Sequence, residues 1–495
     1  MNTAIVRNVS VNIAAQIITA IAGFILPPLI IQTYGSVQNG MVASITQFIA
    51  YLVIVEAGIG TVSIVALTKS LHADDKGKIN SILAATQSFY SKAGGIFIVM
   101  VLILMFAYPH IVSGVDKLTA GLMVLILSAG AILDFFVVGK YRALLIADRK
   151  NYILGIFRII AVVFNTVISV ILIKSGNSFL FVKFISVLIY IFFCYSTILI
   201  YVKMRYKFLN TKEKFDKNTL KQKWDVMYHK FAAIVLESSP LIILTIFCSL
   251  KEVSIYSIYA LVFFAVGQLI DTLSDGMQGF FGRSLAENNS ERLKKIFGKY
   301  EFVYFSMVGV GYTCALLLTI PFMRIYTQNM TDANYIQPTL VVLFVIAGIM
   351  NKARIPASMF IIASGHFKQT KWRAIAEAVI NISAGIFFVN KFGFSGILLG
   401  AIFGMAYRTF DMIIYSSKRI VNNSLLLTFG KILFLGLWYF AGYFILTNFV
   451  ISDIESYLDF AISAGISLAF LAIPAIIYLF TSTLGKHIVF YRERI

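Results

Sequence analysis

Long apolar stretches alternate with short polar segments along almost the whole chain of 495 residues. About fourteen of these stretches are long enough to cross the hydrocarbon core of a bilayer, which takes roughly 20 helical residues. A transmembrane helix is expected in each of the ranges 10–33, 40–67, 89–111, 118–140, 152–174, 180–203, 227–250, 255–282, 300–324, 336–362, 372–392, 394–416, 425–449 and 458–481. Backbone polar groups in lipid must be satisfied within each segment. The predicted fold class is therefore an all-α integral membrane protein with about 14 transmembrane helices.

The pattern repeats itself halfway along the chain. The segment Lys69–Ile79 (KSLHADDKGKI) is echoed by Arg283–Leu293 (RSLAENNSERL), and Pro28–Thr33 returns as Pro240–Thr245. Two halves that run in the same direction, related by an axis along the membrane normal, are a recurring architecture of transporters. Their site usually lies between the halves near the bilayer midplane. The repeat therefore favours transport.

The repeat divides the chain into four predicted segments. Residues 1–203 are expected to form an N-terminal lobe of six helices, and residues 227–420 a C-terminal lobe of six helices. A basic cytoplasmic linker, 204–226, is expected between them. Residues 421–495 have no counterpart in the repeat, so we expect them to form accessory helices 13 and 14 and a cytoplasmic tail.

Composition supports a membrane protein and fixes its expected orientation. Only 13% of the residues are charged, against about a quarter in soluble proteins. Lysine and arginine outnumber acidic residues by 42 to 23. With the N-terminus placed in the cytoplasm, the cations on the outer side are Lys117, Lys174, Lys183, Lys251, Arg324 and Lys391. The positive-inside rule therefore predicts that both termini are cytoplasmic, and the basic excess does not indicate binding of nucleic acid.

Ionisable residues in the middle of the spans are the candidate functional groups, because each costs at least about 2.5–3.5 kcal/mol to insert. Opposite charges buried between helices are the structural alternative, which is favoured for Lys140, Arg142, Arg408 and Asp411 near the cytoplasmic boundary. A role facing the cavity is favoured for Glu56, Glu237, Lys352 and Arg354. The remaining members of the set are Asp134, Arg158, Asp271, Glu377 and Asn381.

The spacing of two residue pairs in this set predicts which side chains lie on the same face of a helix. Glu377 and Asn381 are one helical turn apart, so they share a face. Lys352 and Arg354 are about 200° apart on a regular helix. They can face one cavity only if Pro356 kinks the span; otherwise one of them pairs with a carboxylate such as Asp134.

Several segments together resemble the multidrug/oligosaccharidyl-lipid/polysaccharide (MOP) exporter superfamily. These are the KSL…DDKGKI loop after the second span, ASGHFKQTKWRAIAEAVINISAG from residue 363, and KFGFSGILLGAIFG from residue 391. The resemblance covers about residues 1–420 and is specifically to the Wzx-type flippases of O-antigen and capsule synthesis. Fourteen spans also resemble the related lipid II flippase, but no dense arginine cluster accompanies Arg7 on the first span.

The resemblance implies a flippase of the bacterial cytoplasmic (inner) membrane. It would move an undecaprenyl-pyrophosphate-linked oligosaccharide between leaflets by alternating access, with membrane lipids, polysaccharide polymerase and chain-length proteins as further partners. It also implies that Arg354, Lys352, Arg142 and Arg158 bind pyrophosphate or sugar, that Glu56, Asp134 and Asp271 are gating or cavity carboxylates, and that Glu237, Glu377 and Asn381 bind a coupling ion.

Two alternatives stay open at this point. A multidrug exporter would share the fold and differ in having an anionic cavity. A membrane glycosyltransferase or polymerase would need a large extramembrane loop for its catalytic residues, whereas every predicted outer loop is short. The scattered histidines and cysteines predict neither a metal site nor a resident cofactor, and Na⁺ or H⁺ would act only as the coupling ion.

Overall fold

The computed structural model describes residues 3–56, 58–210, 223–274, 290–364, 366–421, 424–449 and 454–481. All regular structure in these ranges is helical, which confirms the predicted all-α class. The chain forms two compact units, Met1–Ser257 and Ile258–Ile495, which are called the first and second unit below. The predicted boundaries at 203 and 227 stay predictions, because most of the linker, and the tail after residue 481, lie outside the described residues.

Eleven helices within the described ranges are long and apolar enough to cross a membrane. One of them, Trp372–Val421, contains two of the predicted spans joined at a turn. Two shorter apolar helices, Leu236–Phe247 and Tyr457–Leu471, supplement these candidates. A helix therefore occupies each of the fourteen predicted stretches, although the end of the stretch 255–282 falls outside the described residues.

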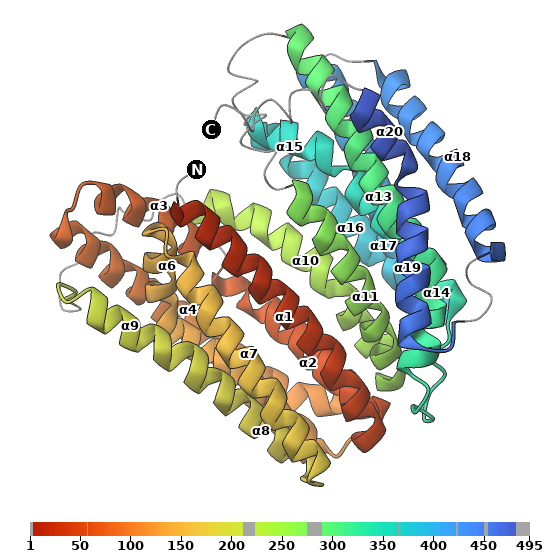
Figure 1. Cartoon of the computed structure of the whole chain (residues 1–495). Coiled ribbons are helices and arrows are strands. Elements are labelled where there is room, and N and C mark those ends of the chain that lie inside the picture. Colours follow the sequence, from red (N-terminus) through yellow and green to blue (C-terminus); the bar gives the residue numbers. More distant parts are fainter. Residues whose placement is uncertain are drawn as a thin grey trace. The chain divides into compact units, whose positions relative to one another are not determined.

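The first unit is a bundle whose members are coloured red to lime in Figure 1. Its elements are α1 (Thr3–Tyr34), α2 (Ser36–Leu52), η1 (Val53–Glu56), α3 (Ile59–His72), α4 (Lys76–Ile111), α5 (Lys117–Leu133), η2 (Asp134–Val138), α6 (Gly139–Ala147), α7 (Asn151–Lys174), α8 (Phe179–Tyr190), η3 (Ile191–Ser196), α9 (Thr197–Arg205) and α10 (Lys223–Phe247). The next helix, α11 (Leu250–Ser274), begins in the first unit and continues into the second.

The second unit contains the remaining helices. Its elements are α13 (Ser290–Tyr326), α14 (Pro338–Ala353), α15 (Ile355–Ala363), α16 (Phe367–Phe392), η5 (Gly393–Ser395), α17 (Gly396–Ser416), η6 (Ser417–Val421), α18 (Leu425–Phe449), α19 (Tyr457–Leu471) and α20 (Ile473–Thr481).

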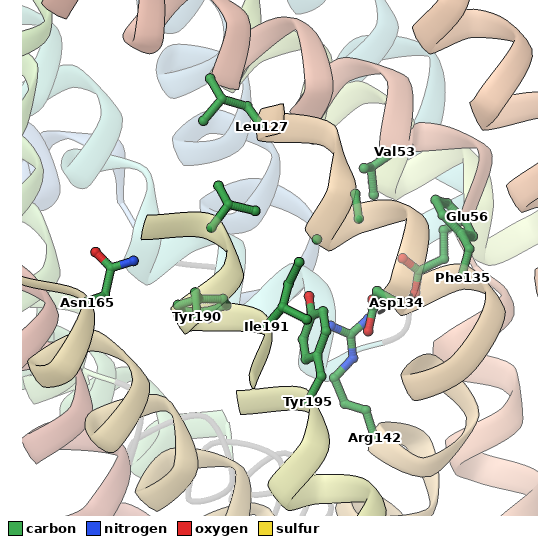
Figure 2. A pocket seen from close by; sticks show the side chains of 13 residues that line it. Val53, Glu56, Leu127, Asp134, Phe135, Arg142, Asn165, Tyr190, Ile191 and Tyr195 are labelled. Carbon is green, nitrogen blue, oxygen red and sulfur yellow. Dashed lines mark ion pairs between the residues drawn. The ribbon is translucent and has the colours of Figure 1, made fainter. Parts of the chain in front are cut away.

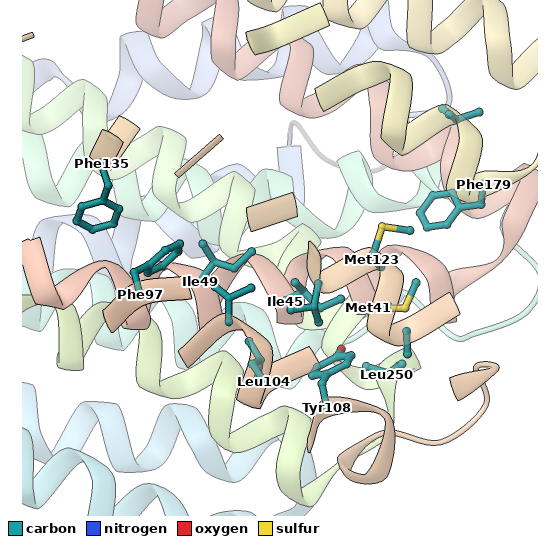
Figure 3. Close-up of a cluster of buried hydrophobic side chains, with 14 of the residues drawn as sticks. Met41, Ile45, Ile49, Phe97, Leu104, Tyr108, Met123, Phe135, Phe179 and Leu250 are labelled. Atoms are coloured by element: carbon teal, nitrogen blue, oxygen red, sulfur yellow. The ribbon is translucent and has the colours of Figure 1, made fainter. Parts of the chain in front are cut away.

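A cluster of buried apolar side chains holds the first unit together (Figure 3). Met41 and Ile45 from α2 are fully buried, as are Phe97 from α4 and Met123 from α5. Phe135 belongs to the same cluster and stacks at an angle on Phe97, with ring centroids 5.1 Å apart. Since lipid offers no hydrophobic drive for helix association, close packing of this kind is what fixes the bundle.

Glycines allow α16 and α17 to pack at very short distance. A Cβ atom on Gly400 would lie 2.3 Å from the backbone nitrogen of Gly385, and one on Gly396 would lie 2.1 Å from the carbonyl oxygen of Phe388. Real contacts of Cβ atoms are never so short, so any side chain there would separate the two helices. The interpretation of residues 396, 400 and 404 as a packing motif is thus confirmed.

The accessory helix α18 is fixed to α13 by polar contacts. Glu301 on α13 is 3% exposed and accepts hydrogen bonds from Lys431 at 2.8 Å and from Thr428 at 3.1 Å. Farther along, the Tyr439 hydroxyl donates to the carbonyl oxygen of Ser306 at 2.9 Å. The ring of Tyr439 fills the space above Gly309, where a Cβ atom would lie 2.0 Å from it. The accessory segment is therefore an integral part of the second unit.

Candidate functional site

A cavity of about 440 Å³, with charged side chains at one end, lies inside the first unit (Figure 2). We call it the first-unit cavity. Its walls come from η1, α5, η2, α6, α7, α8 and η3. The lining residues are Val53, Glu56, Leu127, Gly130, Ala131, Asp134, Phe135, Arg142, Asn165, Val187, Tyr190, Ile191 and Tyr195.

Three of the helices that line the first-unit cavity are interrupted where they meet it. The second span, predicted as continuous over 40–67, breaks into a 3₁₀ turn at Val53–Glu56 and restarts after Gly58, whose φ of +97° is strained for other residues. The fourth span contains a π-helical turn at Asp134–Val138, and the sixth contains one at Ile191–Ser196. Irregular backbone in a membrane is tolerated where it lines a cavity, and π-helical turns are frequent at functional sites.

Three charged residues meet at one side of the cavity. Arg142 Nη2 lies 2.5 Å from Asp134 Oδ2 and 3.5 Å from Glu56 Oε1. Tyr90 donates a further hydrogen bond to Glu56 Oε1 at 2.6 Å. Asp134 is only 9% exposed, and its other oxygen, Oδ1, has no hydrogen-bond partner. Two carboxylates thus share one guanidinium, which leaves a formal charge of −1 and an unsatisfied acceptor.

The opposite side of the cavity is made by α7, α8 and η3. Figure 2 shows Asn165 facing the charged group across the cavity, with Tyr190, Ile191 and Tyr195 between them. The Asn165 amide is anchored, since it donates to the carbonyl and the hydroxyl of Ser186 at 2.6 and 2.9 Å. The rings of Tyr190 and Tyr195 meet edge to face at 6.3 Å. The cavity therefore offers aromatic faces beside its charged end.

Of the residues predicted to bind cargo, Arg142 lies in the first-unit cavity and Arg158 does not line it. Arg158, on α7, is exposed, and it forms no ion pair with another described residue. Glu56 and Asp134, predicted as gating carboxylates, are both in contact with Arg142. The pairing expected for Arg142 near the membrane boundary is therefore observed.

A matching ion pair lies in the second unit. Lys352 Nζ contacts Asp271 Oδ2 at 2.6 Å, and Lys352 is 8% exposed. Gly267, one turn before Asp271, makes room for the lysine, because a Cβ atom there would lie 3.1 Å from Lys352 Cε. Asp271 is one residue from the repeat equivalent of Glu56. In each unit, a carboxylate of the second span of the repeat therefore pairs with a cation that follows two spans later.

Arg354 belongs to a second, larger network in the same unit. It is bonded to Glu377 and donates to Asn351 Oδ1 at 2.7 Å. Arg408 Nε lies 3.7 Å from Glu377 Oε2, and Arg408 Nη1 contacts Asp411 Oδ2 at 2.8 Å. Asp411 is also bonded to Arg373. Three arginines and two carboxylates give this largely buried network, in which Arg373 is the most exposed member, a formal charge of +1.

The expected kink in the tenth span is a short interruption at Arg354, between α14 and α15. It does not bring Lys352 and Arg354 onto one ligand, because each is held by its own carboxylate. The alternative pairing with Asp134 was also wrong, since Asp134 is bonded to Arg142 within the first unit.

The predicted coupling residues fall into different units. Glu377 and Asn381 are buried one turn apart on α16, and the Asn381 amide nitrogen has no partner. Glu377 is already engaged by two arginines. Glu237 lies on α10 in the first unit, where it is exposed. Their common site stays a prediction. Among the described residues, no group of three histidine, cysteine or acidic side chains is placed to hold a metal ion.

Sequence reasoning did not identify Tyr90, Tyr190 and Tyr195 as site residues. On a regular α-helix, Tyr190 and Tyr195 would be about 140° apart. The π-helical turn closes hydrogen bonds between residues five apart and so brings both toward the cavity. Nothing in the sequence IYIFFCYS marks that turn.

Comparison with known proteins shows which solved structures share this fold. No family model matches the sequence, and no curated protein matches it. A structure described as "Lipid II flippase MurJ, inward closed conformation" is similar with a TM-score of 0.69 and 13% identity, covering 93% of this chain and 98% of its own. An inward-facing multidrug resistance MATE family transporter of the MOP superfamily has a TM-score of 0.66 and 13% identity over 83% of this chain and 98% of its own. An outward-facing MATE transporter has a TM-score of 0.54 and 14% identity, over 84% and 95%. The chain has the fold of these MOP transporters.

Proposed function

We propose that this protein is a flippase that moves an undecaprenyl-pyrophosphate-linked oligosaccharide across the bacterial cytoplasmic membrane by alternating access. The observation that carries the proposal is the first-unit cavity, a space with a charged end that is lined by interrupted helices. The cargo has a polar glycan, an anionic pyrophosphate and an apolar tail. A site that shelters the polar part while the tail remains in lipid removes most of the cost of crossing.

The cationic network of the second unit supports recognition of the pyrophosphate. Arg354 and Lys352 are each held by a carboxylate, so neither carries an uncompensated charge in the absence of cargo. A phosphate group offers the same bidentate acceptor geometry as a carboxylate, and arginine matches it better than lysine does. Cargo would therefore bind by displacing Glu377 from Arg354.

The extent of the structural likeness supports a lipid cargo. The lipid II flippase structure covers 93% of the chain, against 83% for the inward-facing MATE transporter. The helix α18 is anchored on α13 through Glu301 and Tyr439, and it carries exposed apolar side chains such as Leu433 and Phe440.

Export of cationic amphiphilic drugs is the second candidate. It is favoured by the formal charge of −1 in the first-unit cavity and by the tyrosine rings beside it. The cation of such a drug would be attracted by Asp134 and Glu56, and its rings by Tyr190 and Tyr195.

Deletion of the gene in its own bacterium tests both functions. A flippase predicts loss of one surface polysaccharide, with its lipid-linked repeat unit retained on the inner leaflet, and restoration by the native gene. A drug exporter predicts unchanged polysaccharide and increased sensitivity to cationic dyes such as ethidium. Normal surface polysaccharide in the deletion strain would refute the flippase proposal.

A further inference from the structure

The first-unit cavity presents hydrogen-bond donors and acceptors side by side. Asp134 Oδ1 is a buried acceptor without a partner, and Glu56 is the second carboxylate held by Arg142. Arg142 uses part of its guanidinium on these carboxylates, and its side chain is still 40% exposed. A guanidinium has five N–H donors, so donors remain for a ligand.

This mixed set of groups narrows the chemistry of the ligand. A bound cation uses acceptors alone and would leave the remaining N–H donors of Arg142 without a partner, although the formal charge of −1 attracts it. A bound anion requires donors alone, and the two carboxylates oppose it. A neutral molecule with several hydroxyl groups both donates and accepts, and it satisfies Arg142 and Asp134 together.

The size and the rest of the lining agree with a hydroxylated ring. A volume of about 440 Å³ is many times that of one water molecule, which takes roughly 30 Å³, and so exceeds what a single ion needs. Tyr190 and Tyr195 supply flat apolar faces next to the polar end, and Leu127 and Ile191 close the apolar wall. Binding sites of this volume characteristically combine such walls with a few placed polar groups.

We propose that the first-unit cavity is a carbohydrate subsite, in which one sugar residue lies against Tyr190 and Tyr195 and bonds through its hydroxyls to Asp134 and Arg142. This inference rests on the proposed function, because it assigns the glycan part of the cargo to the first unit. The subsite depends on the two π-helical turns, since Asp134 and Tyr195 both lie in them.

Saturation-transfer NMR on the full-length protein in nanodiscs tests the subsite directly. The probes are the methyl glycosides of glucose, galactose, rhamnose and N-acetylglucosamine, with tetraphenylphosphonium as a cationic probe. At least one sugar is expected to receive magnetisation on its ring protons. Tyr195→Ala is expected to lower that signal about three- to tenfold, the range of one lost aromatic contact. Asp134→Asn is expected to lower it as well.

Phe193→Ala is the matched control. Phe193 lies in the same π-helical turn but stacks on Phe164, with ring centroids 4.4 Å apart, and does not line the cavity. It is expected to leave the sugar signal unchanged. Thermal unfolding of each variant verifies that the protein is folded. The subsite is refuted if no sugar gives a signal that depends on Tyr195, or if tetraphenylphosphonium alone binds in an Asp134-dependent manner.

A cell assay separates failure of the subsite from failure of the proposed function. In the deletion strain, Tyr195→Ala at native protein level is expected to restore less surface polysaccharide than Phe193→Ala does. Full restoration of surface polysaccharide by Tyr195→Ala would refute the carbohydrate subsite but not the proposed flippase function. Unchanged surface polysaccharide in the deletion strain itself would refute the proposed flippase function.

Discussion

Arg142 holds one oxygen of Asp134 at 2.5 Å and leaves the other oxygen of that carboxylate without a partner. The guanidinium also reaches Glu56, so it is the single cation between two acidic side chains. Removal of the Arg142 guanidinium would leave the Asp134 and Glu56 carboxylates, which carry the same charge, without a cation between them in the predicted spans.

Arg142→Gln is therefore expected to lower both stability and transport. Loss of one partner from a buried ion pair costs about 3–5 kcal/mol, and partial exposure of Arg142 reduces this to roughly 1–3 kcal/mol. Arg142→Lys keeps the charge and should restore part of both. Thermal unfolding in detergent and surface polysaccharide in cells provide the two measurements. An Arg142→Gln protein as stable as the native one would show that the carboxylates do not depend on it.

Lys352 and Asp271 allow charge pairing to be separated from cargo recognition. Lys352→Met alone should reduce the amount of folded protein, because it leaves Asp271 unpaired. The double variant Lys352→Met/Asp271→Asn removes both charges and should recover folded protein, since replacing a whole buried pair is often neutral. If Lys352 contacts pyrophosphate, the double variant stays inactive in polysaccharide export. Recovered export would make the lysine a purely structural partner of Asp271.

Lys352 and Arg354 should also differ in their tolerance of a swapped cation. Arg354→Lys loses the two guanidinium nitrogens of which one holds Glu377 and the other Asn351, whereas Lys352→Arg keeps the charge beside Asp271. Surface polysaccharide at matched protein level is expected to fall severalfold in the first variant and to remain above half in the second. The reverse order would contradict the assignment of Arg354 as the better phosphate ligand.

Glu237 and Glu377 are expected to behave differently although both were predicted to bind the coupling ion. Glu237 is exposed in the first unit, so Glu237→Gln should leave folding unchanged and stop transport. Glu377 is 3% exposed between Arg354 and Arg408, so Glu377→Ala should cost about 3–5 kcal/mol of stability. Protein yield and unfolding temperature distinguish the two. Normal export by Glu237→Gln at every ion gradient would remove that residue from the mechanism.

The contact between α13 and the accessory helix α18 allows side-chain packing to be tested with substitutions that change no charge. Gly309→Ala places a methyl group where the Tyr439 ring lies and should cost about 1–3 kcal/mol. The double variant Gly309→Ala/Tyr439→Leu opens space for the methyl group and should recover part of that loss. A control, Gly436→Ala, introduces the same methyl group on α18 where nothing lies within 4 Å. Equal unfolding temperatures for Gly309→Ala and Gly436→Ala would contradict this docking.

The orientation of the chain in the membrane can be tested by cysteine labelling in intact cells. In a background without native cysteines, Lys117→Cys should react with an impermeant reagent added from outside, and Lys78→Cys should not. Both positions are exposed in the structure. The positive-inside rule places Lys117 outside and Lys78 in a cytoplasmic segment. Labelling of Lys78→Cys alone would invert the predicted topology. Asn218 and Asp453, equally suitable by sequence, lie outside the described residues.

The sequence predicted the structure best where a single physical requirement, such as the length of a membrane span, decides the outcome. Spanning length and apolar content predicted fourteen stretches, each of which contains a helix, and the spacing of Gly396, Gly400 and Gly404 predicted close packing that the structure confirms. The partners of charged side chains could not be predicted in this way. Asp134 was a candidate partner for Lys352 or Arg354, but it is bonded to Arg142, eight positions along its own span. That contact depends on the π-helical turn between them, which no residue type encodes.

The π-helical turn at Asp134–Val138 holds one residue more than an α-helical turn requires. Relaxation of this turn to α-helical geometry would advance everything beyond it by one position, a rotation of about 100° around the helix axis. Asp134 stands at the start of the turn and Arg142 lies beyond it. Such a rotation would carry the guanidinium away from the carboxylate without breaking the helix. The rotational register that the π-helical turn sets is therefore the one that places Arg142 against Asp134.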